Sequence, residues 1–224
     1  MLKFIPYASG STGNLYEVTD GKTRILIECG LPVKEIQRLT NYQLSEFSAC
    51  IVSHGHKDHS KGLNDLKKRI VDCYMGYEIF GGHICNGVDG SLICGDIVIK
   101  AFVVPHSVPC YGFIIKSGAE SMVFMTDLSY CPAPFAFSPT IFALECSYAA
   151  DLIPADCPRE DSIFAHMSLD TCIKTLKAND LSKTREIWLL HISQSHGDPE
   201  RFVREVQEVT GIPTYNAPSW KKQY

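Results

Sequence analysis

Short apolar runs separated by turn residues recur along the chain and predict strands joined by turns. Runs of four to eight apolar or alternating residues favour strands, because a strand buries one or both of its faces. Between residues 71 and 124 the pattern indicates short strands and turns throughout. We expect strands at residues 2–7, 15–18, 24–28, 49–53, 97–104, 112–116, 122–125, 141–144, 187–190 and 212–215.

Four other segments have helical spacing, at residues 33–39, 62–70, 168–177 and 198–209. In the third of them Leu169, Cys172 and Leu176 share one face, and Ser168 is suited to cap the first turn. Strand-rich blocks are thus followed by helices in each half of the chain. This order predicts an α/β (α+β) fold in which two sheets pack together between outer helices, a four-layer αββα sandwich.

Composition bounds the class of protein. The chain has 224 residues, 45% of them hydrophobic, and no linker or repeat divides it. We therefore expect one domain over residues 1–224, large enough to bury a sizeable core. The formal net charge is −4, which gives no overall attraction for nucleic acid. Attraction for a polyanion would have to come from a local patch or from bound metal.

Cysteines and apolar runs indicate the compartment. The ten cysteines form no C-x-x-C pair, which favours reduced, buried thiols over a disulfide framework. No apolar run approaches the roughly 20 residues that span a bilayer, and the first residues lead directly into a strand-like run. We expect a cytoplasmic protein without a membrane partner. Its oligomeric state stays open.

The segment SHGHKDHSKG places three histidines and an aspartate within six residues, directly after a buried strand. These residues are His54, His56, Asp58 and His59. Crowding imidazoles and a carboxylate in one turn costs solvation free energy unless a ligand binds them. On an extended turn, His54 and His56 would point one way while Asp58 and His59 reach the opposite side. Such a cluster can serve two cations at once.

The H-x-H-x-D-H pattern after a strand resembles the signature of the metallo-β-lactamase superfamily. Further positions agree in order: His106 in VVPHSVPCYGF, Asp127 in VFMTDLS and His191 in IWLLHIS. The resemblance implies two metal sites bridged by Asp127. It assigns the first metal to His54, His56 and His106, and the second to Asp58, His59 and His191.

Within the superfamily the chain resembles the YycJ-type (WalJ-type) branch, which is implicated in DNA exonuclease chemistry. The resemblance rests on ASGSTGN, VSHGHKDHSKGL, TDLS and the pair HMSLDTCIKTL and LLHIS. The segment containing His166 is also similar to one in the tRNA 3′-processing endonucleases, where that histidine protonates the leaving group. This implies a catalytic role for His166. The alternative is a surface histidine at a helix start.

Three departures from the branch bear on the substrate. Glu28 in LIECG stands where the branch usually has Asp, one methylene shorter. Glu145 in ALECSY is followed by Cys-Ser rather than Ser-Asn. Residues 148–165 are short and carry one basic residue, Arg159, which weakens the case for a long DNA track.

Charge counting favours a phosphodiester substrate. Two divalent cations supply +4, and Asp58, Asp127 and a metal-bridging hydroxide remove three, so about +1 remains to receive a phosphate. The hydroxide would be the nucleophile, and Asp58 and His166 are the candidate catalytic residues. Five imidazoles and two carboxylates without a thiolate suit Zn²⁺, with Mn²⁺ or Fe as alternatives.

Three functions stay open at this point. The first is a dinuclear metal-dependent phosphodiesterase or nuclease, resembling a DNA exonuclease, whose partner is nucleic acid or another phosphodiester. The second is a hydrolase of a cyclic nucleotide, lactone or thioester on the same scaffold, and the third is a non-enzymatic metal-binding protein.

Two further segments have alternative interpretations. The turn at residues 9–14 either presents N–H groups to phosphate or only joins a hairpin. A basic cluster consists of Lys57, Lys61, Lys67, Lys68 and Arg69. It either contacts the phosphates of a bound polymer or is only the solvated face of a helix.

Overall fold

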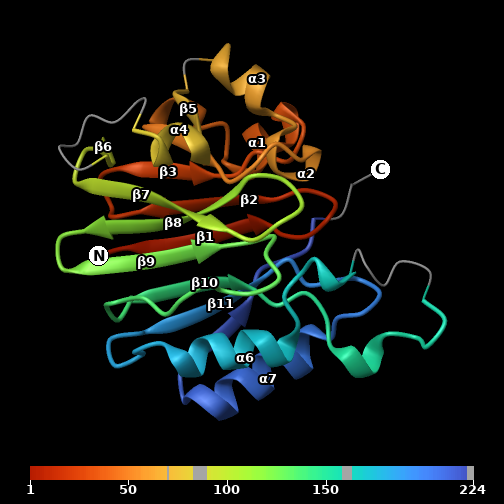
Figure 1. The fold of residues 1–224 in the computed structure, drawn as a ribbon. Helices are drawn as coiled ribbons and strands as arrows, with labels where there is room; N and C mark the ends of the chain where they lie inside the picture. Colours follow the sequence, from red (N-terminus) through yellow and green to blue (C-terminus); the bar gives the residue numbers. More distant parts are fainter. Residues whose placement is uncertain (70, 83–89, 158–162, 221–224) are drawn as a thin grey trace.

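The computed structural model describes residues 1–69, 71–82, 90–157 and 163–220. Two sheets of these residues face each other, and helices cover both outer faces (Figure 1). The four-layer αββα sandwich expected from the sequence is confirmed. Arg159 and Ile70, the last residue of the helix expected at residues 62–70, lie outside the described residues.

The smaller sheet has the strand order β1-β2-β3-β4-β5. The first three strands are antiparallel, and β3, β4 and β5 run parallel. Its strands are β1 (Lys3–Ala8), β2 (Leu15–Thr19), β3 (Arg24–Ile27), β4 (Ala49–Val52) and β5 (Cys73–Met75). Every residue of β4 is buried, as expected for a parallel strand covered on both faces. Helices α1 (Val33–Leu39) and α3 (Leu63–Lys67) pack Ile36 and Leu66 against its outer face.

The larger sheet has the strand order β12-β11-β10-β9-β8-β7-β6. Strands β6 to β9 are antiparallel, and β9 to β12 are parallel. They are β6 (Leu92–Cys94), β7 (Ile97–Val104), β8 (Cys110–Ser117), β9 (Glu120–Met125), β10 (Ile141–Glu145), β11 (Glu186–Leu190) and β12 (Thr214–Asn216). Helices α6 (Leu169–Ala178) and α7 (Pro199–Thr210) cover its outer face, as Figure 1 shows.

The ends of these two helices follow sequence signals. The side chain of Ser168 accepts a hydrogen bond from the N–H of Thr171 and so caps α6, as predicted. Asp198 caps α7 through the N–H of Arg201, and Pro199 follows it in the first turn. Gly211 ends α7 with a φ of 70°, a conformation that glycine adopts without strain.

Four short helical turns among the described residues were not predicted from the sequence. The structure has α2 (Lys57–Ser60) and α4 (Gly76–Phe80), together with 3₁₀ turns at Leu44–Glu46 and Ala150–Leu152. The sequence GYEIF has aromatic and β-branched residues that favour strands. Tertiary contact overrides this preference, because Gly76 packs directly against the side chain of Tyr111. The Glu78 carboxylate also accepts a hydrogen bond from the N–H of Met75 at 2.7 Å.

No helix among the described residues is long and apolar enough to cross a membrane. The cysteines that the structure describes are free thiols, as expected.

A ring cluster fills the space between the two sheets. Phe124 of β9 lies 5.2 Å from the Tyr16 ring and 6.3 Å from the Phe113 ring, measured between centroids. It also contacts the ring of Phe4 at 6.4 Å. All four side chains are buried in one core cluster that joins both sheets. The position of one sheet on the other therefore depends on this packing.

Phe124→Ala should lower the free energy of unfolding by about 3–5 kcal/mol, because it leaves a cavity between the sheets. Urea denaturation of the metal-free protein measures the change. Val209→Ala on α7, where Val209 is 42% exposed, is the matched control and should change stability by less than about 0.5 kcal/mol. Equal effects of the two variants would contradict this account of the core.

Candidate metal centre

Polar and charged residues follow the ends of parallel strands in both sheets. In the larger sheet Asp127 follows β9, Glu145 ends β10 and His191 follows β11. In the smaller sheet Glu28 follows β3, and His54 comes two residues after the end of β4. The carboxyl ends of parallel strands meet at one edge of a sheet, which is where ligands of α/β folds bind. The packing of the two sheets brings these edges together.

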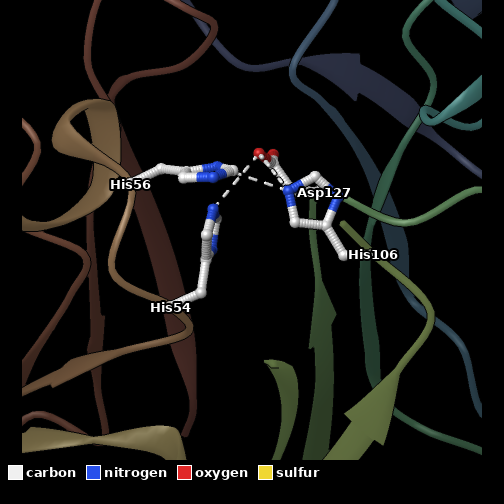
Figure 2. Close-up of side chains that lie close together, drawn as sticks. All are labelled: His54, His56, His106 and Asp127. Carbon is white, nitrogen blue, oxygen red and sulfur yellow. Dashed lines mark hydrogen bonds and ion pairs between the residues drawn. The ribbon is translucent and has the colours of Figure 1, made fainter. Parts of the chain in front are cut away.

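The first group of side chains is His54, His56, His106 and Asp127, which converge in Figure 2. One ligand atom from each lies within 4.8 Å of the others. His54 Nε2 is 3.6 Å and His106 Nε2 is 3.9 Å from Asp127 Oδ2. His106 Nε2 is 3.4 Å from His56 Nδ1. The structure thus brings together the residues predicted for the first metal.

The second group is Asp58, His59, Asp127 and His191, again within 4.8 Å of one another. His59 Nε2 is 3.2 Å from Asp127 Oδ2 and 3.4 Å from Asp58 Oδ2. His191 Nε2 is 3.5 Å from Asp127 Oδ1 and 3.7 Å from Asp58 Oδ2. Asp127 belongs to both groups, at the place expected of a bridging carboxylate. All seven residues predicted as ligands therefore lie in one cluster.

The spacing of these atoms fits metal ions better than hydrogen bonds. Most of the separations exceed the 2.7–3.2 Å of an N–H···O bond. Ligands about 2.1 Å from a tetrahedral zinc ion would lie roughly 3.4 Å apart, close to the distances found. Among the described residues, the buried Nε2 atoms of His54 and His191 have no hydrogen-bond partner. Such atoms are costly unless a ligand satisfies them.

The segment that carries Asp58 and His59 is helical, which corrects the extended turn expected from the sequence. The N–H groups of His59 and Ser60 donate to the carbonyl of His56 at 3.0 and 2.9 Å. Ser60 Oγ donates to the same carbonyl at 2.9 Å. A strand ends before His54 and a helical turn begins at Lys57, so the two halves of the motif lie on different backbone directions.

The turn at residues 9–14 supports the cluster from the opposite side. The N–H of Asn14 donates to the carbonyl of Asp58 at 2.8 Å, and the N–H of His191 donates to Ser9 Oγ at 2.8 Å. The N–H groups of Ser9, Gly10 and Gly13 also donate hydrogen bonds to acceptors within the protein. These bonds give the turn a structural role beside the cluster. Sequence reasoning missed Asn14 and Ser9, whose partners are distant along the chain.

Three residues at this edge have left-handed backbone conformations. Their φ angles are 65° at Glu28, 53° at Asp127 and 54° at His191. This conformation costs a non-glycine residue about 1–2 kcal/mol, and such strain gathers at functional sites. The N–H of Glu28 donates to the carbonyl of Ile51 at 2.8 Å, which helps to hold its strand end in place.

Burial and opposite charge divide the histidines into two kinds. Burial lowers the pKa of His54 to about 3, and burial also lowers the pKa of His106. Burial would lower the pKa of His191 as well, but Asp127, Asp58 and Glu145 outweigh it and raise the pKa to about 10. The pKa of His59 is likewise raised well above its usual value by the carboxylates of Asp127 and Glu28, against burial.

His166 lies at the edge of this cluster and is paired with a buried carboxylate. Its Nδ1 is 2.7 Å from Glu145 Oε1, and its ring stacks on the His191 ring with centroids 5.0 Å apart. Burial opposes the charge of His166, but Glu145 raises its pKa. The side chain is 22% exposed and lines a cavity of about 560 Å³. Glu145 was given no role in the sequence analysis. A charged residue at the end of the apolar strand IFALE could have indicated a functional carboxylate.

Glu28 and Glu145 anchor the strand ends around the cluster. Glu28 is fully buried, 3.4 Å from His59 Nδ1, and its carboxylate accepts the N–H of Ser53 at 3.3 Å. Glu145 accepts the N–H of Leu128, next to Asp127, at 2.7 Å. Carboxylates behind metal-binding histidines orient the rings.

Comparison with known proteins agrees with this geometry. The family model described as "Beta-lactamase superfamily domain" matches residues 23–192. The chain belongs to this superfamily. This stretch includes each of the seven clustered ligand candidates and His166.

Similar proteins support the YycJ-type branch. The exodeoxyribonuclease WalJ of Streptococcus pneumoniae is 23% identical over 238 aligned positions, which cover 94% of this chain and 87% of WalJ. The exodeoxyribonuclease YycJ of Bacillus anthracis is 26% identical over 147 positions, 58% of this chain and 55% of YycJ. The resemblance to this branch is confirmed.

Among solved structures, the metallo-beta-lactamase fold protein YhfI from Bacillus subtilis superposes with a TM-score of 0.73 at 20% identity. The match covers 99% of this chain and 100% of that chain. This likeness shows the fold. Superfamily membership and the His/Asp cluster together support a hydrolase that uses divalent metal ions.

Zinc binding should release protons from one group of histidines and not from the other. At pH 7.5 without metal, nearby carboxylates favour the protonated forms of His59 and His191 by raising both pKa values, to about 10 for His191, whereas burial favours neutral His54 and His106 by lowering theirs. Ligands must be deprotonated, so we expect about two protons to leave with the second metal and few with the first. Affinity for that second metal should rise with pH toward the pKa of His191.

Calorimetric titration at pH 7.5, in buffers that differ in ionisation enthalpy, counts these protons. Equal proton release for the two zinc ions would contradict the division of the histidines.

Proposed function

We propose that this protein is a two-metal phosphodiesterase that acts on nucleic acid ends. The observation that carries the proposal is the pair of ligand groups that share Asp127, next to the His166–Glu145 pair. The first metal would be held by His54, His56 and His106, the second by Asp58, His59 and His191, and both by Asp127. Histidine and carboxylate ligands without thiolate suit Zn²⁺, with Mn²⁺ or Fe as alternatives.

Bound divalent cations would activate water and offset the negative charge of a phosphate. Asp58 is the more open of the two carboxylates in the cluster, with its side chain 25% exposed against 3% for Asp127. It would accept a hydrogen bond from the attacking water and orient it, in addition to its ligand role. The buried Asp127 would remain in place between the two sites.

His166 would protonate the departing oxygen. Its Nδ1 is engaged by Glu145, which leaves Nε2 to deliver a proton. Glu145 also raises the pKa of His166, which favours the protonated ring that a general acid needs. This is the arrangement of a general acid with an orienting carboxylate. A thioester, whose thiolate leaving group needs less protonation than an alkoxide, would give His166 little to do.

Two observations bear on the substrate. The similar proteins WalJ and YycJ are named exodeoxyribonucleases, which supports a nucleic acid end. The cavity beside His166 holds about 560 Å³, within the usual range for small ligands, and favours a small phosphodiester such as a cyclic nucleotide as the second candidate. The basic cluster at residues 57–69 is exposed, and its Lys68 lies 4.0 Å from Asp65.

A substrate panel tests the proposal. We expect end-labelled DNA or RNA to be cleaved faster than a cyclic mononucleotide, a lactam or a thioester. If the basic cluster contacts two to four phosphates, the slope of log K against log salt should be about −2 to −4. Lys67→Glu with Arg69→Glu should weaken binding of polymers only. Faster turnover of the cyclic mononucleotide or thioester than of every polymer would overturn the nuclease proposal.

His166→Ala should keep its bound metal and lose about 10²–10⁴-fold in turnover on a poor leaving group. The loss should shrink for p-nitrophenolate, which needs little protonation. Steady-state rates on matched phosphodiesters, with metal content measured alongside, provide the test. An equal loss on good and poor leaving groups would make His166 a positioning residue. Asp156→Ala, in the same cavity lining, is the control variant and should preserve the dependence on leaving group.

A further inference from the structure

A second cavity borders the cluster and shares no lining residue with the cavity beside His166. It holds about 390 Å³ and borders His54 and His56, the residues of the first ligand group. The larger cavity of about 560 Å³ borders His166 and His191 instead. The cluster therefore borders two separate cavities, and a diester bound at the cluster has room for a substituent in each of them.

The walls of the smaller cavity are mostly apolar. Beyond the motif itself, they come from the end of β5, from α4 and from the loop between β7 and β8. The side chains are Met75, Tyr77, Val108 and Pro109. Met75, Val108 and Pro109 carry no group that can read the hydrogen-bonding edge of a base. Recognition in this cavity would therefore depend on shape and stacking.

Tyr77 is an aromatic side chain left half-exposed next to a polar site. It is 53% exposed, so its ring contributes little to the core. The short helix that carries it is fixed by the 2.7 Å bond from the Met75 N–H to Glu78 and by the contact of Gly76 with Tyr111. An exposed ring on an anchored helix, beside the proposed phosphate site, is suited to stack on a base.

The position of His166 determines which part of a substrate reaches this cavity. The alcohol that leaves must be close to His166, in the larger cavity. In an in-line displacement the attacking water lies opposite the leaving oxygen, so the substituent that stays on phosphorus projects to the side, and the cavity beside His54 and His56 has room for it. In a nucleotide, that substituent carries a flat base, and stacking of bases on aromatic rings tolerates any sequence.

We propose that the smaller cavity binds the nucleobase of the nucleotide that keeps the scissile phosphate, with Tyr77 as its stacking residue. The inference rests on the proposed phosphodiesterase function. Stacking on the base would supply binding energy for the substrate. A chain with a net charge of −4 has no broad basic surface to supply that energy.

Two esters with the same leaving group test the inference: thymidine 5′-(p-nitrophenyl phosphate) and methyl p-nitrophenyl phosphate. In each, water adds to phosphorus and the bond to p-nitrophenolate breaks, and the retained group is thymidine or methyl. We expect the metal-loaded enzyme to prefer the thymidine ester by about 5- to 150-fold in kcat/KM, as one stacked base provides. The preference should lie mainly in KM, because the base is remote from the reacting atoms.

Tyr77→Ala should reduce this preference toward one, and Tyr77→Phe should keep it. Tyr42→Ala, which removes a 74% exposed ring outside this cavity, should leave the preference unchanged. An equal rate for the two esters in the wild type, or a preference that survives Tyr77→Ala, would overturn the base site while the phosphodiesterase function stands. If neither ester is hydrolysed although end-labelled DNA is cleaved, the base site is wrong; if DNA is not cleaved either, the proposed function fails and takes the base site with it.

Discussion

The structure depends on one buried carboxylate surrounded by imidazoles. Asp127 is 2% exposed and lies within 4 Å of nitrogen atoms of His54, His59, His106 and His191. Removing a carboxylate from water is costly unless positive charge compensates for it. In the metal-free protein, protonated histidines supply that charge and hold the pKa of Asp127 well below its usual range, against burial. Metal ions would replace those protons. The buried Asp127 carboxylate therefore makes the site costly to fold and also makes it suited to bind cations.

Both sheets are arranged around this requirement. Each contributes strand ends with left-handed residues, Glu28 in one sheet and Asp127 and His191 in the other. The phenyl ring of Phe124 lies in the core between the sheets, three residues before Asp127. Hydrogen bonds from the turn at residues 9–14 tie Asp58 and His191 to the smaller sheet. The ligand cluster is thus placed by the core, and the two cavities beside it are consequences of the same packing.

Local sequence patterns are enough to predict part of the fold. Buried strands such as Ala49–Val52 and the capped helices starting at Leu169 and Pro199 follow from apolar spacing and cap residues, and the sandwich follows from their order. The seven clustered residues came from the H-x-H-x-D-H motif and its resemblance to a family. The helix Gly76–Phe80 was missed because contact with Tyr111 overrides its strand-like composition. The pairing of Glu145 with His166 was missed because it joins residues whose approach depends on the folded sheet edge.

The number of metal ions bound per chain tests the central claim most directly. Elemental analysis of metal-supplemented, desalted protein should find about two divalent ions in the wild type. Because Asp127 serves both ligand groups, Asp127→Ala should lose metal from both sites, whereas Asp58→Ala should lose mainly one ion. Two ions in the wild type that fall together in Asp127→Ala would match the account. A wild-type content near zero, or an Asp127→Ala variant that retains both ions, would contradict it.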